Sequence, residues 1–201
     1  MSTSLVPLVL ATHNAHKVTE LRYILGAQLD GIDLVAYDGP EPVEDGDSFA
    51  ANALIKARAA SAHTGLAAIA DDSGIAVATL GGAPGIHSAR YAGTRDDADN
   101  VRLLLANLRG ADDRSADFLC AAALVLPDGR ETVKLARWPG SVLREPAGAG
   151  GFGYDPIFTP TGYGVSAAEL SSDKKNVISH RAQAFEALMP IVRQLLLSQH
   201  T

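Results

Sequence analysis

The stretch Ile69-Ala70-Asp71-Asp72-Ser73-Gly74-Ile75 places two adjacent carboxylates between apolar runs that span residues 66–70 and 75–80. Short apolar runs containing Val and Ile are typical of buried strands. Neighbouring carboxylates beside buried strands repel each other unless a divalent cation or a shared proton neutralises them. Asp-Ser-Gly is also ordinary turn composition. The stretch therefore predicts two strands that flank either a metal site or a polar hairpin turn.

The composition of the whole chain limits the classes of protein to which it can belong. The chain has 201 residues, of which 47% are apolar and 20% charged, which predicts one domain, or one domain with two lobes, spanning residues 1–201. The net charge of -6 argues against long nucleic acid as a partner but allows a small phosphate ester bound by local cations. Cys120 is the single cysteine, so no internal disulfide is expected, and its apolar surroundings predict a buried thiol. With no leader pattern and no apolar run of membrane-spanning length, we expect a cytoplasmic protein that does not bind membranes.

The N-terminal segment predicts a strand, a polar loop and a helix. The strand covers residues 5–11, the loop Thr12–Lys17 follows it, and the helical pattern stops at Gly26. Such an arrangement directs backbone amides and the positive helix end toward an anion. Thr12 and Asn14 can cap the helix. Lys17 opposes the helix dipole, which makes more sense if an anion binds beside it; otherwise it points to water.

A second helix is predicted downstream of an acidic loop. Ser48 is a suitable N-cap for a helix over residues 49–63. Asn52 and Lys56 lie four residues apart and therefore on one face of it. Glu44 precedes the helix in the loop 38–47, which is rich in Gly, Pro and acidic residues.

The remaining segments complete an α/β pattern. A further strand is expected over residues 32–37, and strands over 118–126 and 131–138 are joined by the hairpin signal Asp128-Gly129. Helices are predicted over 96–108, 167–170 and from Ser179 to about Ser198, where Pro190 should introduce a kink. Glycine-rich loops at 81–91 and 148–156 are long enough to be functional. Alternating strands and helices followed by a hairpin predict an α/β fold with a mixed sheet.

Several of these segments occur together in one known family. The chain resembles the inosine triphosphate pyrophosphatases, which act on non-standard purine nucleoside triphosphates. The blocks that carry the resemblance span the chain in the order and spacing of the family: Thr12-x-Asn14-x-x-Lys17, Phe49 with Asn52-Ala53-x-x-Lys56-Ala57, Ala70-Asp71-Asp72-Ser73-Gly74, Gly81-Gly82-Ala83-Pro84-Gly85-x-x-Ser88-Ala89-Arg90-Tyr91, Gly150-Gly151-Phe152-Gly153-Tyr154-Asp155-Pro156 and Ser179-His180-Arg181.

The resemblance implies a hydrolase that cleaves between the α and β phosphates and releases a monophosphate and pyrophosphate. The substrates implied are inosine, deoxyinosine and xanthosine triphosphates (ITP, dITP and XTP), which such an enzyme removes from the nucleotide pool. It also implies Mg²⁺, a homodimer, and an elongated mixed sheet flanked by helices, with the site in a cleft between two lobes.

Specific roles follow from the matching positions. Glu44 and Asp72 would bind Mg²⁺ through oxygen ligands, and Asp72 would also orient or deprotonate the attacking water. Asp71 would be a neighbouring metal ligand or would raise the basicity of Asp72. Phe152 would stack on the purine, and Lys175, His180 and Arg181 are the donors available to a 6-oxo group. The full set of expected substrate-binding residues is Thr12, His13, Asn14, Ala15, His16, Lys17, Lys56, Ser73, Phe152, Gly153, Tyr154, Asp155, Lys175, His180 and Arg181.

The chain also departs from the family. Ala51 stands where many relatives have Glu, which puts in doubt a metal scheme needing a third carboxylate from this helix. His13 and His16 make the first loop unusually rich in imidazole; they could contact phosphate at low pH, but we expect them to face solvent. Two other functions stay open: a Maf-like pyrophosphatase for modified nucleotides, and a sensor that binds a nucleoside triphosphate without cleaving it.

Overall fold

A computed structural model describes residues 5–198, and within them it contains one six-stranded sheet of order β2-β1-β3-β4-β5-β6. Strand β1 pairs in parallel with β2 and β3, whereas β5 and β6 are antiparallel, so the sheet is mixed as predicted. The strands are β1 (Val6–Leu10), β2 (Ile32–Ala36), β3 (Ala68–Val77), β4 (Ser115–Val125), β5 (Glu131–Val142) and β6 (Phe158–Pro160). The α-helices are α1 (Ala15–Leu25), α2 (Phe49–Thr64), α3 (Asp97–Asn107), α4 (Ser172–Ile178) and α5 (His180–Leu197). None of the helices within residues 5–198 is long and apolar enough to cross a membrane.

The chain divides into two compact units, each with its own core. The first unit contains the described residues up to Asp72, together with Cys120–Ala136 and the residues from Arg181 onward. The second unit contains Ser73–Leu119 and Arg137–His180.

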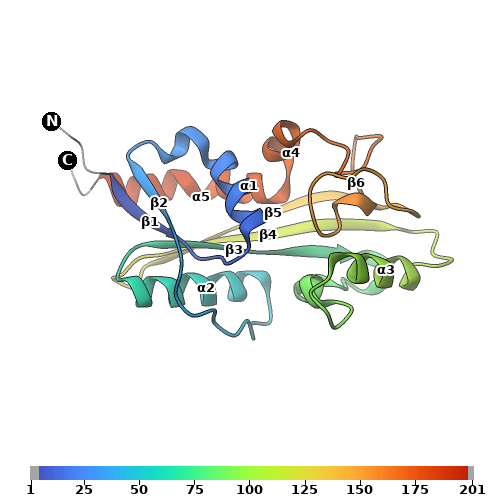
Figure 1. Cartoon of the computed structure of the whole chain (residues 1–201), viewed down its shortest axis with the longest axis horizontal. Helices are drawn as coiled ribbons and strands as arrows, with labels where there is room; N and C mark the ends of the chain where they lie inside the picture. Colours follow the sequence, from blue (N-terminus) through green and yellow to red (C-terminus); the bar gives the residue numbers. More distant parts are fainter. Residues whose placement is uncertain (1–4, 199–201) are drawn as a thin grey trace. The chain divides into compact units, whose positions relative to one another are not determined.

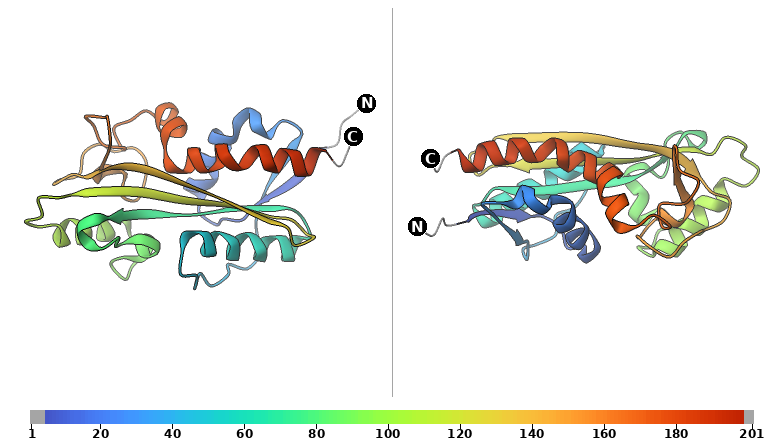
Figure 2. Two further views of the ribbon diagram at one scale, coloured as in Figure 1. Left: turned by 180° about the vertical axis from the view of Figure 1, so that it is seen from behind. Right: turned by 90° about the horizontal axis from the view of Figure 1, so that it is seen from above.

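In the first unit, alternating side chains of the strands build two apolar layers. Leu10, Ile69 and Ala122 face one side, where they pack with buried residues of α1 and α5. Ala70 and Ala121 are among those facing the other side, where α2 covers them. Figure 1 shows α1 and α5 on one side of these strands and α2 on the other, and Figure 2 shows α5 running alongside the first-unit parts of β4 and β5.

The layer under α2 is made largely of alanine. Ala53, Ala57 and Ala60 of α2 are buried against a strand surface that includes Ala68 and Ala123. Small side chains on both surfaces allow the helix backbone to approach the sheet closely. Polar residues on the same helix are thereby brought within reach of side chains in β3.

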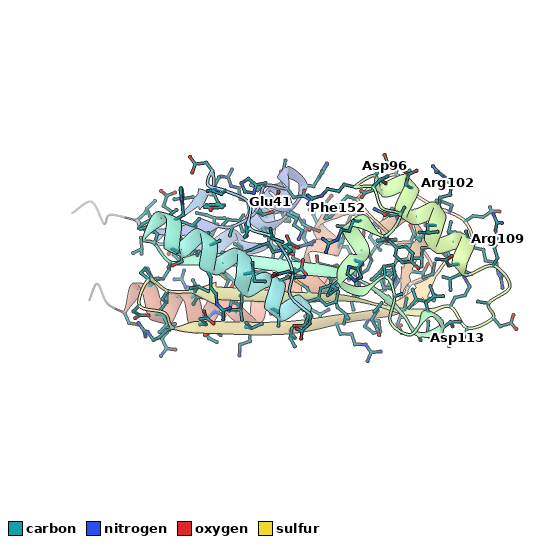
Figure 3. All side chains as sticks on the ribbon, turned by 90° about the horizontal axis from the view of Figure 1, so that it is seen from below. Glu41, Asp96, Arg102, Arg109, Asp113 and Phe152 are labelled. Carbon is teal, nitrogen blue, oxygen red and sulfur yellow. The ribbon has the colours of Figure 1, made fainter. Side chains whose placement is uncertain are left out.

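The second unit has an aromatic core. Phe118 of β4, Trp138 of β5 and Phe158 of β6 are buried, and α3 adds Val101 and Leu104. Phe118 and Phe158 meet edge to face with ring centroids 4.6 Å apart, a favourable geometry for two aromatic rings. Figure 3 labels Asp96 and Arg109, which lie at the two ends of α3 in this unit.

Three expectations about elements need correction. The residues around Asp71 and Asp72 form one continuous strand, β3, rather than two strands with a turn between them. Residues 167–170 form a turn, and the helix of this region is α4, which begins after Ser171. The β4–β5 hairpin is longer than predicted at both outer ends, and β6 was not predicted. The last helix begins directly after Ser179, as expected, but the Ser179 amide closes α4 through the Lys175 carbonyl.

Candidate active site

The loop after β1 is organised by its own side chains. The Asn14 side-chain oxygen accepts from the amides of His16 and Lys17 at 3.0 and 3.3 Å, so Asn14 caps α1 as predicted. Thr12 accepts a hydrogen bond from the Asn14 amide at 3.2 Å. Ala15 and His16 are exposed in the first turn of the helix.

Lys17 points neither to water nor into an empty space. Its Nζ lies 3.0 Å from Oδ2 of Asp71, and only 15% of its side chain is exposed. A carboxylate of the protein itself thus lies beside this unfavourably placed cation. The ion pair offsets the repulsion between the ammonium and the positive end of α1.

A second cation meets Asp71 from α5. Arg181 donates through Nε to Asp71 at 3.1 Å and through Nη1 to Glu20 of α1. Burial raises the pKa of Asp71, but the charges of Lys17 and Arg181 outweigh it and hold the pKa well below its usual range. Arg181 is itself almost completely buried, and its pKa lies above the usual value despite burial because Asp71 and Glu20 face it.

This arrangement differs from the expectation for Arg181. Two of its donor nitrogens face carboxylates of the first unit, whereas we had expected the side chain to donate to a base. Glu20 was missed in the sequence, although it lies three residues after Lys17 and therefore on the same side of α1.

Asp72 lies on the opposite face of β3 and has a separate set of partners. Lys56 Nζ lies 3.0 Å from its Oδ1 and 3.3 Å from Oε1 of Glu44. Asn52 donates to Asp72 Oδ2 at 3.2 Å and accepts from the Gly46 amide at 2.9 Å. Glu44, Asn52 and Lys56 thus lie together with Asp72 in one group of polar side chains.

The alternation of the strand explains how two adjacent carboxylates coexist. Asp71 shares the face of Ile69 beside α1 and α5, while Asp72 shares the face of Ala70 beside α2. Burial raises the pKa of Asp72, and Lys56 and Lys17 oppose this only in part. Burial lowers the pKa of Lys56, but Asp72, Asp71 and Glu44 outweigh it and leave that pKa raised. The two carboxylates lie on separate faces, with Lys17 and Arg181 beside Asp71 and Lys56 beside Asp72, and this arrangement lessens the repulsion between them.

The donor set around Lys56 is compatible with a hard divalent cation. Within residues 5–198 no three His, Cys, Asp or Glu side chains gather closely enough to hold a metal by themselves. Glu44 and Asp72 nevertheless each place a carboxylate oxygen within 3.3 Å of one ammonium nitrogen. Mg²⁺ is usually held by one or two carboxylates, with water and substrate phosphates completing its shell. Two carboxylates are enough if phosphate oxygens supply further ligands.

In the second unit, the loop before β6 is built around Asp155. Its Oδ2 accepts from the Phe152 amide at 2.8 Å and from Lys175 Nζ at 2.6 Å. Lys175 is buried, and its Nζ lies 5.1 Å from the centroid of the half-buried Phe152 ring. Gly151 has φ of +70°, and a Cβ there would lie 2.1 Å from Asp155 Oδ2, so the loop requires glycine at this position.

Two further contacts fix the same loop. The Gly153 amide donates to Asp97 of α3 at 2.7 Å, and Figure 3 shows Phe152 near the Asp96 end of that helix. The Tyr154 hydroxyl donates to the Ser88 carbonyl at 2.8 Å, and burial raises the Tyr154 pKa. The glycine-rich segment 81–91, which contains Ser88, thus supports the second glycine-rich loop. Asp97 and Ser88 were not among the predicted site residues, although Ser88 belongs to one of the blocks that carry the family resemblance.

His180 and Ser73 complete the predicted set. The His180 ring is buried and stacks on Phe118, with centroids 4.7 Å apart and planes 5° from parallel. His180 and Arg181, the first two residues of α5, are therefore both buried. Ser73 is half-buried in β3, immediately after Asp72.

A known protein family matches most of the chain. The sequence profile of the Ham1 family matches residues 8–191. The chain belongs to the Ham1 family.

Individual Ham1 relatives match over nearly their whole length. A Leifsonia xyli protein named "dITP/XTP pyrophosphatase" is 55% identical over 95% of this chain and 98% of its own. The structure of a Ham1 protein from Coxiella burnetii is 41% identical, covers 94% of this chain and 98% of its own, and has a TM-score of 0.85. A Mycobacterium abscessus structure described as a nucleoside-triphosphatase / dITP/XTP pyrophosphatase is 46% identical, covers 94% of this chain and 100% of its own, and has a TM-score of 0.74.

Proposed function

We propose that this Ham1 protein hydrolyses ITP, dITP and XTP to the corresponding monophosphate and pyrophosphate with the help of Mg²⁺. The observation that carries the proposal is the position of Lys56 between the carboxylates of Asp72 and Glu44, with Asn52 bonded to Asp72. Cations, carboxylates and a helix N-terminus in one unit are the groups that phosphoryl transfer needs. Ham1 relatives named for this activity match almost the entire chain.

The phosphates are assigned to the first unit. Lys17, Lys56 and the loop Thr12–Lys17 would face the charge that spreads over the phosphate oxygens in the transition state. Glu44 and Asp72 would hold Mg²⁺, which supplies charge neutralisation to the phosphates when bound. Asp72 would accept the proton of the attacking water. Asp71, held ionised by Lys17 and Arg181, would keep both cations charged and in place.

The base is assigned to the second unit. Phe152 would stack on the purine, and Lys175, fixed beside that ring by Asp155, would donate to the 6-oxo group. Adenine presents an amine there, so a donor would face a donor, which is unfavourable in a buried site. We prefer Lys175 to Arg181 for this role because Arg181 faces Asp71 and Glu20. His180 would hold the start of α5 against the aromatic core.

Product analysis tests the function directly. Purified protein with Mg²⁺ is incubated with dITP, XTP, dATP and dGTP, and the products are separated by ion-exchange chromatography. We expect monophosphate and pyrophosphate, formed fastest from dITP and XTP. Diphosphate with orthophosphate would contradict the bond assignment, and binding without any product would favour a sensor. Preference for a modified pyrimidine nucleotide would favour the Maf-like alternative. The homodimer and the cytoplasmic location remain predictions.

A further inference from the structure

His13 is placed differently from the expectation that it only faces solvent. The residue is exposed, but its Nε2 lies 3.0 Å from the Gly39 carbonyl. A carbonyl can only accept, so Nε2 must carry the proton in this contact. The His13 ring also lies against Tyr37, with centroids 5.5 Å apart and planes tilted by 56°.

Tyr37 contacts the same segment, and we call the bonds of His13 to Gly39 and of Tyr37 to Pro40 the anchor. Its side chain is buried, its hydroxyl donates to the Pro40 carbonyl at 3.0 Å, and its ring meets His63 of α2 edge-on. Gly39 packs so closely that a Cβ there would lie 2.5 Å from the Tyr37 hydroxyl. His13 and Tyr37 therefore hold the same short piece of chain from two sides.

That piece of chain leads to Glu44. Residues 37–47 contain no helix or strand. At the downstream end the segment is fixed by the bonds from Gly46 to Asn52 and from Glu44 to Lys56. At the upstream end His13 bonds to the Gly39 carbonyl and Tyr37 to the Pro40 carbonyl. Fixing both ends lowers the conformational entropy that Glu44 must lose when it binds a ligand.

We propose that His13 is a positioning residue, which fastens the segment 38–43 to the loop Thr12–Lys17 and so holds Glu44 ready for the metal. The proposal rests on the proposed function for the role of Glu44, but the anchor itself does not depend on it. His13 is one residue away from the helix cap Asn14. The bond to Gly39 therefore joins the loop assigned to phosphate with the segment assigned to metal.

The first test needs no activity. Hydrogen exchange of the metal-free protein is followed by mass spectrometry for the wild type, His13→Ala and His87→Ala. His87 is an exposed histidine of the second unit and serves as the matched control. We expect peptides covering residues 38–43 to exchange up to about fivefold faster in His13→Ala, the size of one ordinary hydrogen bond. Equal exchange in all three proteins would overturn the anchor.

The second test uses turnover of dITP at varied Mg²⁺. For His13→Ala we expect the Mg²⁺ concentration at half-maximal rate to rise about two- to fivefold. His13→Gln keeps an N–H donor and should recover part of the loss, which removal of bulk alone would not explain. If hydrogen exchange is faster but the Mg²⁺ dependence is unchanged, His13 stabilises the loop without positioning Glu44, and the proposal is overturned. If the wild type itself forms no product, the proposed function fails, and the exchange experiment still decides the anchor.

Gly39→Ala gives an independent check from the other side of the contact. Its Cβ would displace the Gly39 peptide from Tyr37 while His13 stays intact. The double variant His13→Ala/Gly39→Ala should then be less impaired than the two single effects added together, because both remove one contact. Strict additivity would show that His13 and Gly39 act separately and would overturn the proposal.

Discussion

Burial acts on Asp71 and Asp72 alike, yet their pKa values move in opposite directions. Asp71 accepts from two cations, Lys17 and Arg181, and stays ionised. Asp72 has a single ammonium close by, Lys56, which it shares with Glu44. A buried carboxylate that pairs with two cations is a structural group, whereas one with incomplete compensation is suited to bind a metal or take up a proton.

This difference predicts opposite phenotypes for two isosteric variants. Asp72→Asn should lower kcat by about 10² or more, the usual contribution of a general base, while nucleotide binding is largely retained. In the metal-free protein the free energy of unfolding of Asp72→Asn should equal or exceed that of the wild type. The pKa of Asp72 is higher in the folded than in the unfolded protein, so ionisation of this carboxyl destabilises the fold once the pH rises above the pKa of the unfolded state. Steady-state kinetics measure kcat, and urea unfolding measures the free energy of unfolding. If Asp72→Asn turned over substrate at the wild-type rate, Asp72 would be neither the general base nor a metal ligand.

Asp71→Asn should instead weaken the fold. The change leaves Lys17 and the almost fully buried Arg181 without the carboxylate that both contact. Breaking a buried pair by removing one partner costs about 3 to 5 kcal/mol. Urea unfolding should show this loss, with Glu145→Gln at a surface position as a control for removing one acidic charge. A stability equal to that of the control would mean that Glu20 alone satisfies the two cations.

At the level of loops and helices, two glycines allow the effect of close packing to be distinguished from the effect of backbone strain. Gly151 and Gly162 both have positive φ, +70° and +84°, but only a Cβ at Gly151 would meet another group, Asp155 Oδ2. Alanine at either position strains the backbone. Gly151→Ala should also displace Asp155 from Lys175 and Phe152, and so reduce the ratio of kcat/KM for dITP to that for dATP. Gly162→Ala should leave this ratio unchanged. Equal ratios in both variants would place base discrimination outside the Asp155–Lys175 pair.

Local signals explain which elements the sequence could predict. The Asn14 cap, the Ser48 cap and the shared face of Asn52 and Lys56 all depend on residues within one helical turn, and all are observed. Helix α4 was missed because Ser172–Ile178 begins with five polar or charged residues and has no apolar period. The continuous strand β3 was missed because the cations that allow Asp71 inside it are distant in the chain.

The same limit applies to the candidate site. Lys17 and Asp71 are 54 positions apart and Arg181 and Asp71 are 110 apart, so no local pattern connects them. The contact from His13 to Gly39 and the stacking of His180 on Phe118 are also non-local. The resemblance supplied which residue types matter, but only the tertiary structure shows which face of β3 each partner approaches.

For the molecule as a whole, ligand binding should appear as a change in stability. A ligand that binds only the native state stabilises it by about 2.7 kcal/mol at a free concentration of 100 Kd. For a chain of this size that corresponds to a rise in Tm of roughly 5 to 11 °C. The Asp72→Asn variant allows the measurement without turnover, although its weaker metal binding should place the shift at the lower end of that range.

Thermal unfolding of Asp72→Asn is therefore followed with Mg²⁺ and equal concentrations of dITP, XTP and dATP. We expect dITP and XTP to raise Tm by more than dATP does, because Lys175 can donate to a 6-oxo group but not to an amine. The variant Lys175→Met, which removes the donor and keeps the length of the side chain, should bring the three shifts closer together. Equal shifts for all three nucleotides in the Asp72→Asn background would show that this protein selects its substrates during the chemical step and not on binding, and the assignment of Lys175 to base recognition would then fail.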